Sequence, residues 1–304
     1  PWTFAFAGDE AGGTVKGSER KLSGSYYTPD SLVQELLRSA LDPVIERALR
    51  DNPTDPRGAL LRLRVLDPAC GSGHFLLGAA RRLADAVARL DMEGDLPDEA
   101  ARRRALREVV RRCIFGVDRN PLSVELCRTA LWIEAIEPGK PLSFLDAHIK
   151  CGDSLIGVGD LKVLKAGIPD EAFKELTGDD KAYCRDLRKQ NKGERDNPTL
   201  TLLPEVALPP DLAAAIAALT DAPEDTLAAV QDKRRALREV TEGRAAHDLR
   251  VACDLWCAAF FASKAARPEM RGRDMVPTTD TVWRYLRAPS SVYGPLIGAV
   301  EELR

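Results

Sequence analysis

The sequence predicts an α/β protein, with a partial parallel sheet in the first half of the chain and a long helical region after it. Three observations support this fold class. An apolar run ends at Asp67 and is followed closely by Gly71 and Gly73. A long amphipathic pattern, typical of a helix that packs on a sheet, comes next. Two further expected strands also end in acids, a short buried one at 114–118 and a third at about 147–151 that leads to Asp153.

The turn after Asp67 has the features of a site for a nucleotide-like ligand. We expect the preceding strand over the apolar run 61–66 and the helix soon after Gly73. Glycines let backbone approach a ligand that a side chain would exclude, while amide groups at a helix N-terminus point at its polar groups. A dinucleotide-binding fingerprint fits less well, because Leu76 occupies its third glycine position and no acid follows at the usual spacing.

Composition is that of an ordinary soluble protein of 304 residues. The chain has no run of about 18 apolar residues and no signal-peptide pattern, so we expect a cytoplasmic protein without a membrane partner. Seven cysteines form no Cys-x-x-Cys pair and come with only three histidines, which predicts reduced thiols rather than a metal site or a disulfide framework. A net charge of −3 gives no overall basic field, so any DNA contact must be local or lie elsewhere in a larger protein.

Acids are expected at the ends of the second and third strands as well. Asp118 follows the apolar segment 114–117, and a carboxylate at this position can accept hydrogen bonds from both ribose hydroxyls of a nucleotide. A third strand is expected at about 147–151, and it runs into Gly-Asp-Ser-Leu, where the acid is Asp153. Gly-Asp-Ser alone would be interpreted as a surface turn. Asp153 is, however, the third acid expected at a strand end, and this position favours a binding role.

Four short strings resemble motifs of S-adenosylmethionine-dependent methyltransferases, in particular the adenine N6-specific DNA enzymes. The string Asp-Pro-Ala-Cys-Gly-Ser-Gly closely resembles motif I, and Tyr-Tyr-Thr-Pro upstream of it resembles motif X. Gly-Val-Asp-Arg-Asn-Pro and Gly-Asp-Ser-Leu look like motifs II and III. The order X, I, II, III is that of the gamma-type enzymes.

The resemblance implies S-adenosylmethionine as the cofactor and a set of residues that bind it. The motif X segment would cover the methionine end, Asp118 would bind the ribose, and Asp153 would accept a hydrogen bond from the exocyclic amine of the adenine. It assigns no catalytic residue and no metal ligand. The cofactor-binding residues implied are Tyr26, Tyr27 and Thr28, then Asp67, Ala69, Cys70, Gly71, Gly73 and Phe75, then Asp118, Arg119 and Asn120, and finally Asp153, Ser154 and Leu155.

By the same resemblance, the core is a Rossmann-like methyltransferase fold with a partial sheet and a long helical insertion. The larger protein would methylate adenine N6 in double-stranded DNA, within a restriction-modification or phage-defence system. The family's next motif, Asn-Pro-Pro followed by an aromatic residue, holds the flipped adenine. We do not find it: 197–199 lacks the second proline and the aromatic, and 208–211 lacks the asparagine and the aromatic.

We therefore expect this chain to be inactive alone, with residues after Arg304 or another polypeptide completing the sheet. Two alternatives stay open. The chain could be a non-catalytic subunit that binds the cofactor and docks a partner protein through its helical half. It could also belong to an enzyme that methylates a glutamine amide in protein, because an amide nitrogen presents a similar planar amine to the same pocket.

Changes in composition suggest four parts of the chain. Thr28 and Pro29 are expected as the N-cap and first residue of a helix that extends to about Ile45. Charged residues of both signs dominate the third part, which is expected to be exposed and mobile. The parts are an N-terminal arm (1–23), the S-adenosylmethionine-binding core (24–157), the charged insertion (158–200) and a helical region (201–304), with helices expected at about 209–219, 223–242, 244–263, from 282, and near 291–303.

Overall fold

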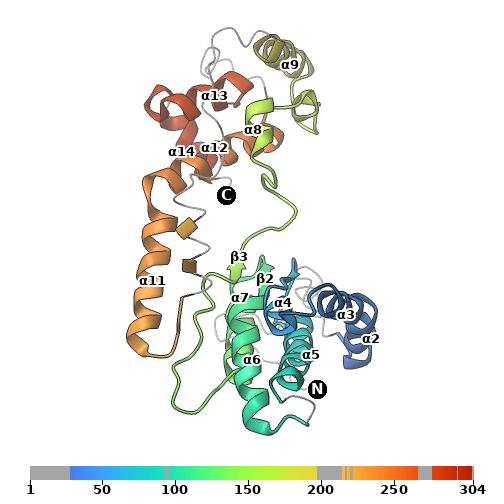
Figure 1. Ribbon diagram of the computed structural model, residues 1–304. Coiled ribbons are helices and arrows are strands. Elements are labelled where there is room, and N and C mark those ends of the chain that lie inside the picture. Colours follow the sequence, from blue (N-terminus) through green and yellow to red (C-terminus); the bar gives the residue numbers. More distant parts are fainter. Residues whose placement is uncertain are drawn as a thin grey trace, which may run out of the picture. The chain divides into compact units, whose positions relative to one another are not determined.

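The computed structural model describes residues 28–92, 96–196, 214–215, 218–219, 222–265, 276–292 and 294–302. The chain divides into two compact units. Unit 1 runs through Glu134 and includes Ile149–Gly152, while unit 2 consists of Ala135–His148 and the chain from Asp153 onward (Figure 1). No helix in the described ranges is long and apolar enough to cross a membrane. The domain limits expected from the sequence stay predictions.

Unit 1 is built on a small parallel sheet with the strand order β1-β2-β3. Parallel neighbours need crossover connections, and helices supply them here. The predicted α/β class, with a partial parallel sheet in the first half of the chain, is therefore confirmed. The strands are β1 (Val65–Asp67), β2 (Ile114–Asp118) and β3 (Ile149–Cys151), and the helices of unit 1 are α2 (Asp30–Ala40), α3 (Asp42–Asp51), α4 (Pro56–Leu61), α5 (His74–Asp91), α6 (Glu99–Cys113) and α7 (Pro121–Glu134).

The two faces of this sheet differ in burial. Side chains alternate along a strand, and residues paired across parallel strands share a face. Ile114 and Ile149 lie on the covered face and are fully buried. The opposite face carries Leu66, which is 61% exposed, and its register partner Phe115, over whose ring the guanidinium of Arg64 lies at 5.8 Å. Within the described residues, helices thus cover one face of the sheet.

Two local expectations about unit 1 are wrong. Leu61 belongs to α4 rather than to the first strand, because Asp55 caps this short helix by accepting a hydrogen bond from the amide of Gly58 at 2.9 Å. The apolar run 61–66 therefore changes from helix to strand partway. Thr28 is not the N-cap of the first helix either: α2 begins at Asp30, and Pro29 holds the cap position without a side-chain hydrogen bond.

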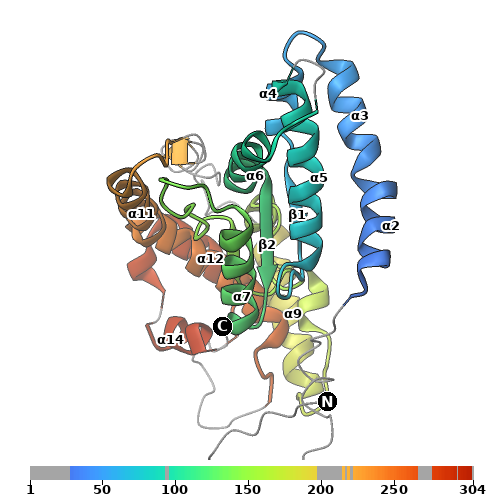
Figure 2. The ribbon, with the colours of Figure 1, turned by 90° about the horizontal axis from the view of Figure 1, so that it is seen from below.

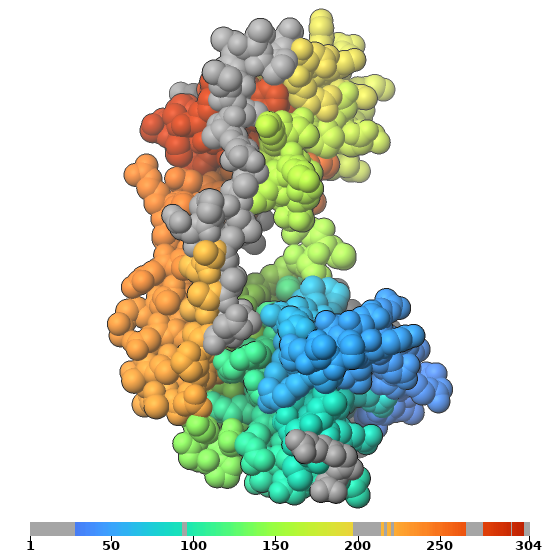
Figure 3. All heavy atoms as spheres, in the orientation of Figure 1, coloured from blue at the N-terminus to red at the C-terminus, as the bar shows by residue number. Residues whose placement is uncertain are grey.

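Helices α2 and α3 lie beside α5 and follow one another as a broken rod (Figure 2). The break falls at Leu41, two residues before Pro43, which has no amide proton to continue the helical hydrogen bonds. Arg82 on α5 holds both helices, because its guanidinium donates to Asp42 at 2.6 Å and to Gln34 at 2.7 Å. Side chains of α2 and α3, blue in Figure 3, form a broad part of the visible surface of unit 1.

Unit 2 is helical in its described parts. Its elements are α8 (Lys162–Ala166), the 3-10 helix η1 (Asp170–Phe173), α9 (Lys181–Asp196), α11 (Leu227–Glu242), α12 (Arg244–Phe261), α13 (Thr279–Arg287), the 3-10 helix η4 (Pro289–Ser291) and α14 (Gly294–Glu302). The helices predicted near 223–242, 244–263, 282 and 291–303 are confirmed. Most of the helix predicted at 209–219 lies outside the described residues.

The segment expected to be an exposed insertion contributes to the core of unit 2. Leu164, Ile168 and Phe173 are almost fully buried, and they pack with apolar side chains of α12, α13 and α14. Asn191 on α9, also buried, donates to the carbonyl of Ile168 at 2.8 Å and accepts from the amide and hydroxyl of Thr279. The dense charge of this segment hid these apolar positions, because they are few and spread over short helices.

A second cluster in unit 2 joins α11 to the segment 135–148, which connects α7 to β3 along the chain. Its apolar side chains include Phe144, Val230 and Leu237. A buried ion pair lies beside them: Lys233 donates to Glu224 at 2.5 Å, and both side chains are at most 2% exposed. The other carboxylate oxygen of Glu224 accepts the amide of Phe144 at 3.0 Å. This carboxylate therefore links the start of α11 to the connecting segment.

Replacing Lys233 with methionine should destabilise this cluster by about 3–5 kcal/mol, because the Glu224 carboxylate would stay buried without its cation. Arg235→Met is the matched control on the same helix. Arg235 pairs with Asp232 at the surface, with side chains 70% and 68% exposed, so its loss should cost less than about 1 kcal/mol. Hydrogen-exchange mass spectrometry of α11 peptides measures both effects, and equal losses of protection would contradict the expectation.

Candidate functional site

The candidate site is the turn that leads from β1 into α5, together with the end of β2. Two backbone hydrogen bonds fix the shape of the turn. The amide of Cys70 donates to the carbonyl of Val117 in β2 at 2.9 Å, and the amide of Gly73 donates to the carbonyl of Cys70 at 2.8 Å. Asp67, at the end of β1, accepts the amide of Ala69 at 3.0 Å. The turn is thus held both by itself and by the neighbouring strand.

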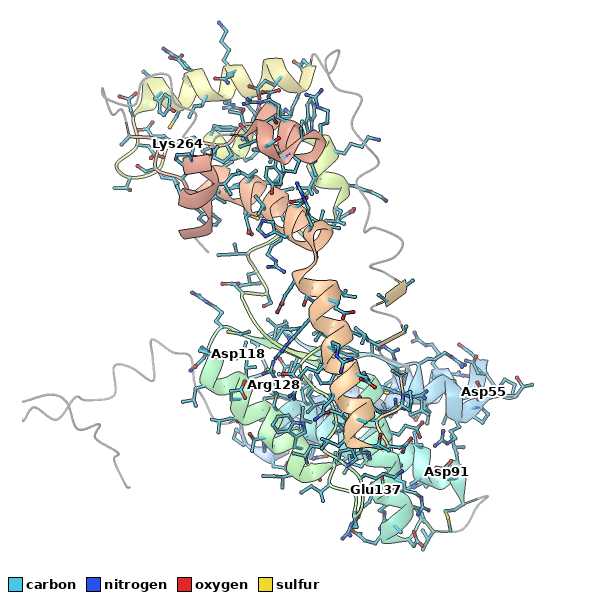
Figure 4. All side chains as sticks on the ribbon, turned by 90° about the vertical axis from the view of Figure 1, so that its left-hand side faces the viewer. Asp55, Asp91, Asp118, Arg128, Glu137 and Lys264 are labelled. Atoms are coloured by element: carbon cyan, nitrogen blue, oxygen red, sulfur yellow. The ribbon has the colours of Figure 1, made fainter. Side chains whose placement is uncertain are left out.

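Asp118 joins this turn to the end of β2. One carboxylate oxygen accepts the amide of Gly71 at 2.9 Å, and the other accepts the amide of Asn120 at 2.8 Å. The side chain of Asn120 in turn accepts the amide of Leu122 at 3.0 Å, within the first turn of α7. Each carboxylate oxygen can accept more than one hydrogen bond, so Asp118 keeps capacity for a ligand. Figure 4 labels Asp118.

The two glycines of the turn are needed for different reasons. Gly71 has a φ of +53° and Gly73 a φ of +88°, both in the left-handed region that favours glycine. A Cβ added to Gly73 would lie 2.7 Å from the sulfur of Cys127, whereas one added to Gly71 would meet no atom within 4 Å. Gly73 thus permits close packing on α7. Gly71 faces open space, where a ligand could approach its backbone.

Helix α5 begins next to this open space. Its N-cap is Gly73, and no side chain caps it. The first turn of a helix leaves amide groups without partners in that helix, and these amides attract polar or negatively charged groups. The sequence therefore places an uncapped helix N-terminus, a glycine turn and a strand-end carboxylate together.

Two cysteine thiols lie beneath the turn, and only one of them was identified from the sequence. Cys70 belongs to the turn, while Cys127 comes from α7 and is fully buried. The side chain of Cys127 lowers the pKa of Cys70, and the side chain of Cys70, together with burial, raises the pKa of Cys127. The spacing of Val124, Cys127 and Leu131 marks the sheet-facing side of α7, which is the one sequence signal that could have pointed to Cys127.

The structure brings together only part of the predicted residue set. Asp67, Cys70, Gly71, Gly73, Asp118 and Asn120 share the contacts described above. Ala69 and Arg119 are exposed beside them, and Phe75 is half-buried in the first turn of α5. Whether any of them binds a cofactor stays a prediction.

The third predicted element follows β3 and belongs to unit 2. Asp153 accepts the amides of Leu155 at 2.8 Å and Ile156 at 3.2 Å, so it organises a local turn. Ser154 is exposed and Leu155 is 93% exposed. Tyr26 and Tyr27 lie outside the described residues, and Thr28 is half-buried ahead of α2. The roles implied for these residues remain expectations.

Residues 15–156, just under half of the chain, match the family model described as N-6 DNA Methylase. This region covers the glycine turn, Asp118 and Asp153. The chain therefore carries a region of this family, and the expected resemblance to adenine N6 methylases is confirmed at that level.

Curated relatives are distant. The chain is 27% identical over 194 residues to the adenine-specific methyltransferase PglX of Streptomyces coelicolor, a match that covers 61% of this chain. It is 26% identical over 150 residues to the type II restriction enzyme and methyltransferase RM.Eco57I of Escherichia coli, and 24% identical over 173 residues to a protein of Methanocaldococcus jannaschii, each match covering 44% of this chain. Each match spans only 14% of the relative's own length. No solved structure matches the chain.

Replacing Gly73 with alanine should destabilise unit 1 by about 2–4 kcal/mol, since it adds both backbone strain and a clash with Cys127. Gly71→Ala adds strain without a clash and should cost about 1 kcal/mol. The double variant Gly73→Ala, Cys127→Ala removes the sulfur and should recover the part due to the clash. Hydrogen exchange of α5 peptides tests this order, and equal costs for the two single variants would mean that the contact with Cys127 is unimportant.

Proposed function

We propose that residues 24–157 form the S-adenosylmethionine-binding part of a Rossmann-like methyltransferase core. The observation that carries this proposal is the hydrogen bond between the Gly71 amide and the Asp118 carboxylate. It places a strand-end acid, suited to a ribose diol, directly against a glycine turn and an uncapped helix. Carboxyl ends of parallel strands form the usual binding edge of such sheets.

The residues present fit this cofactor. Asp118 would accept hydrogen bonds from the ribose hydroxyls, and the open space at Gly71, which a Cβ would partly fill, would admit the cofactor to the backbone. Asp153, which follows β3, would accept from the adenine amine. Tyr26, Tyr27 and Thr28 would cover the methionine end. When bound, the cofactor supplies an electrophilic methyl group, and the chain's own residues hold and orient it.

The substrate proposed is the N6 amine of adenine in double-stranded DNA. Support comes from the N-6 DNA Methylase match and from the relatives, whose names describe adenine-specific methylation and restriction-modification. We therefore place the protein in a bacterial restriction-modification or phage-defence system acting in the cytoplasm. A further polypeptide region would supply the base-binding motif and the strand beside β1. Protein-glutamine methylation has no comparable support among the relatives.

A non-catalytic role remains a second candidate, and one observation favours it. The 304 residues contain no Asn-Pro-Pro-aromatic string, which the resemblance associates with holding the adenine. A subunit that binds the cofactor and docks a partner through its helices would need no such string. A search for the motif in a partner or in adjoining coding sequence separates the two candidates.

Asp118→Ala should weaken binding of S-adenosylmethionine by about 2–4 kcal/mol, because two charge-assisted hydrogen bonds to the ribose would be lost. Asp118→Asn, which keeps one carbonyl acceptor, should lose less. Asp91→Ala is the control. It removes an acid at the last residue of α5, about 25 Å along the helix from the first turn that faces the site. Calorimetry on the three variants decides the point, and unchanged affinity of folded Asp118→Ala would overturn the ribose assignment.

We expect this 304-residue chain to bind the cofactor without transferring its methyl group to DNA. The N6 lone pair is delocalised into the purine ring, and acceptors that would orient this amine toward the methyl group are absent from the readable motifs. The test incubates the chain with tritiated S-adenosylmethionine and unmethylated bacterial DNA. Label in adenine above background would show that residues 157–304 contain a base-binding motif that we have missed.

A further inference from the structure

Helix α9 of unit 2 is strongly basic, although the whole chain has a net charge of −3. Its 16 residues include six basic and three acidic side chains. The helix lies along the border of unit 2 in Figures 1 and 4. Its buried side chains, which are Cys184, Leu187 and Asn191, anchor one side of it, and the charges occupy the remaining surface.

Four of the basic residues lie along one line of α9, and we call this line the basic stripe. With 3.6 residues in each helical turn, the four positions fall within about 80° of the helix circumference and span about 17 Å along its axis. All four side chains are exposed. The basic stripe consists of Lys181, Arg185, Lys189 and Lys192.

Helix stability does not account for the basic stripe. Lys181 is the first residue of α9, where the helix dipole disfavours a cation. Arg185 follows it by four residues, and Lys189 follows Arg185 by another four. Like charges at this spacing lie side by side and destabilise a helix. The basic stripe therefore repels itself, and an external polyanion would relieve the repulsion.

Nearby acids do little to neutralise the basic stripe. Its three lysines form no ion pair within the described residues. Arg185 reaches only its neighbour Asp186, at 3.9 Å, and with side chains 79% and 73% exposed this pair is weak. Glu194 instead accepts the amide of Asp280, at the start of α13. Asp196 lies one helical turn past Lys192, at the end of α9.

The arginine-rich helix α6 of unit 1 shows the contrast. Three of its arginines have an acid within 4 Å, either on the same helix or on α5, so much of its charge is balanced within unit 1. The pairs are Arg102 with Asp85 at 3.4 Å, Arg103 with Glu99 at 3.1 Å, and Arg112 with Glu108 at 3.7 Å.

We propose that the basic stripe of α9 binds the phosphate backbone of double-stranded DNA. The inference rests on the proposed function for its choice of DNA as the polyanion. It goes beyond that function because α9 lies outside residues 15–156, the region that matches the methylase family. Unit 2 thereby gains a part in holding the substrate.

Lysines suit this task because each ammonium group is a compact charge with three hydrogen-bond donors for phosphate oxygens. B-DNA carries one negative charge for about every 1.7 Å of its axis, so a stripe about 17 Å long faces several phosphates. Phosphate contacts position a duplex but read no bases. The basic stripe would therefore hold DNA of any sequence, and it supplies a local basic surface on a chain whose net charge is negative.

The test compares two variants of the full chain that lose the same charge. The stripe variant carries Lys181→Gln, Lys189→Gln and Lys192→Gln. The control variant replaces three exposed arginines of α11, another helix of unit 2, where two of them lie within 4 Å of acids. Its substitutions are Arg234→Gln, Arg235→Gln and Arg238→Gln.

Fluorescence anisotropy with a labelled DNA duplex of mixed sequence measures binding at several concentrations between about 50 and 200 mM salt. The stripe variant should bind at least about tenfold more weakly at the lowest salt, and its plot of log affinity against log salt should be shallower by about 3, one for each lost phosphate contact. The control variant should stay within about threefold of the parent. Arginine at the same three positions of α9 should restore binding, because it keeps the charges.

Four results would contradict the proposal. The parent chain binds no DNA at low salt, or the stripe and control variants weaken binding equally, so that net charge alone accounts for the loss. Alternatively, the arginine variant fails to restore binding, or an RNA duplex of the same sequence depends on the basic stripe while DNA does not.

Calorimetry with S-adenosylmethionine keeps this result separate from the proposed function. If the parent binds the cofactor while the stripe variant binds DNA normally, the basic stripe is wrong as a DNA site and the proposed function stands. If the parent fails to bind the cofactor but binds DNA through the basic stripe, the proposed function fails and the DNA-binding surface stands.

Discussion

The carboxylate of Asp118 is the interaction on which the candidate site depends. Its two oxygens accept amides from two different turns, that of Gly71 after β1 and that of Asn120 after β2. A carboxylate that accepts backbone amides forms stronger hydrogen bonds than a neutral acceptor. This side chain therefore sets the distance between the two strand ends, and any ligand that binds across them meets a spacing fixed in advance.

Under the proposed function, the same carboxylate would have two tasks that compete for its lone pairs. Each oxygen already accepts one amide, and a ribose diol would add one hydroxyl to each. Four acceptor positions are enough for both tasks. The arrangement nevertheless couples them, because a movement of the Gly71 amide also moves the carboxylate. Tight packing of Gly73 on Cys127 extends this coupling to α7.

Polar strand ends were predictable from the sequence, because an acid after an apolar run is a local pattern. Asp67 and Asp118 were found in this way, and the two glycines from the turn that follows Asp67. The contact of Gly71 with Asp118 fits the parallel pairing of β1 with β2, which brings the two strand ends to one edge. The spacing of apolar residues in α7 could have indicated that Cys127 is buried, but its close approach to Gly73 depends on how α7 packs and could not be predicted from the sequence. Apolar positions such as Leu164 and Phe173 were missed for a related reason: α8 and η1 have only 5 and 4 residues, so each buries too few side chains to produce a period.

The contacts that hold the glycine turn all come from one side of β1, namely from β2 and α7. The amide of Cys70 bonds to β2, the Gly71 amide bonds to Asp118 in β2, and Gly73 packs on α7. None of these contacts uses the edge of β1 opposite β2, which has no strand partner within the described residues, or the face that carries the exposed Leu66. A strand added at that edge would cover apolar surface and hold a base, but the turn already has its shape without it. Under the proposed function, the residues that would bind the cofactor and the strand that would hold the base therefore lie on opposite sides of β1.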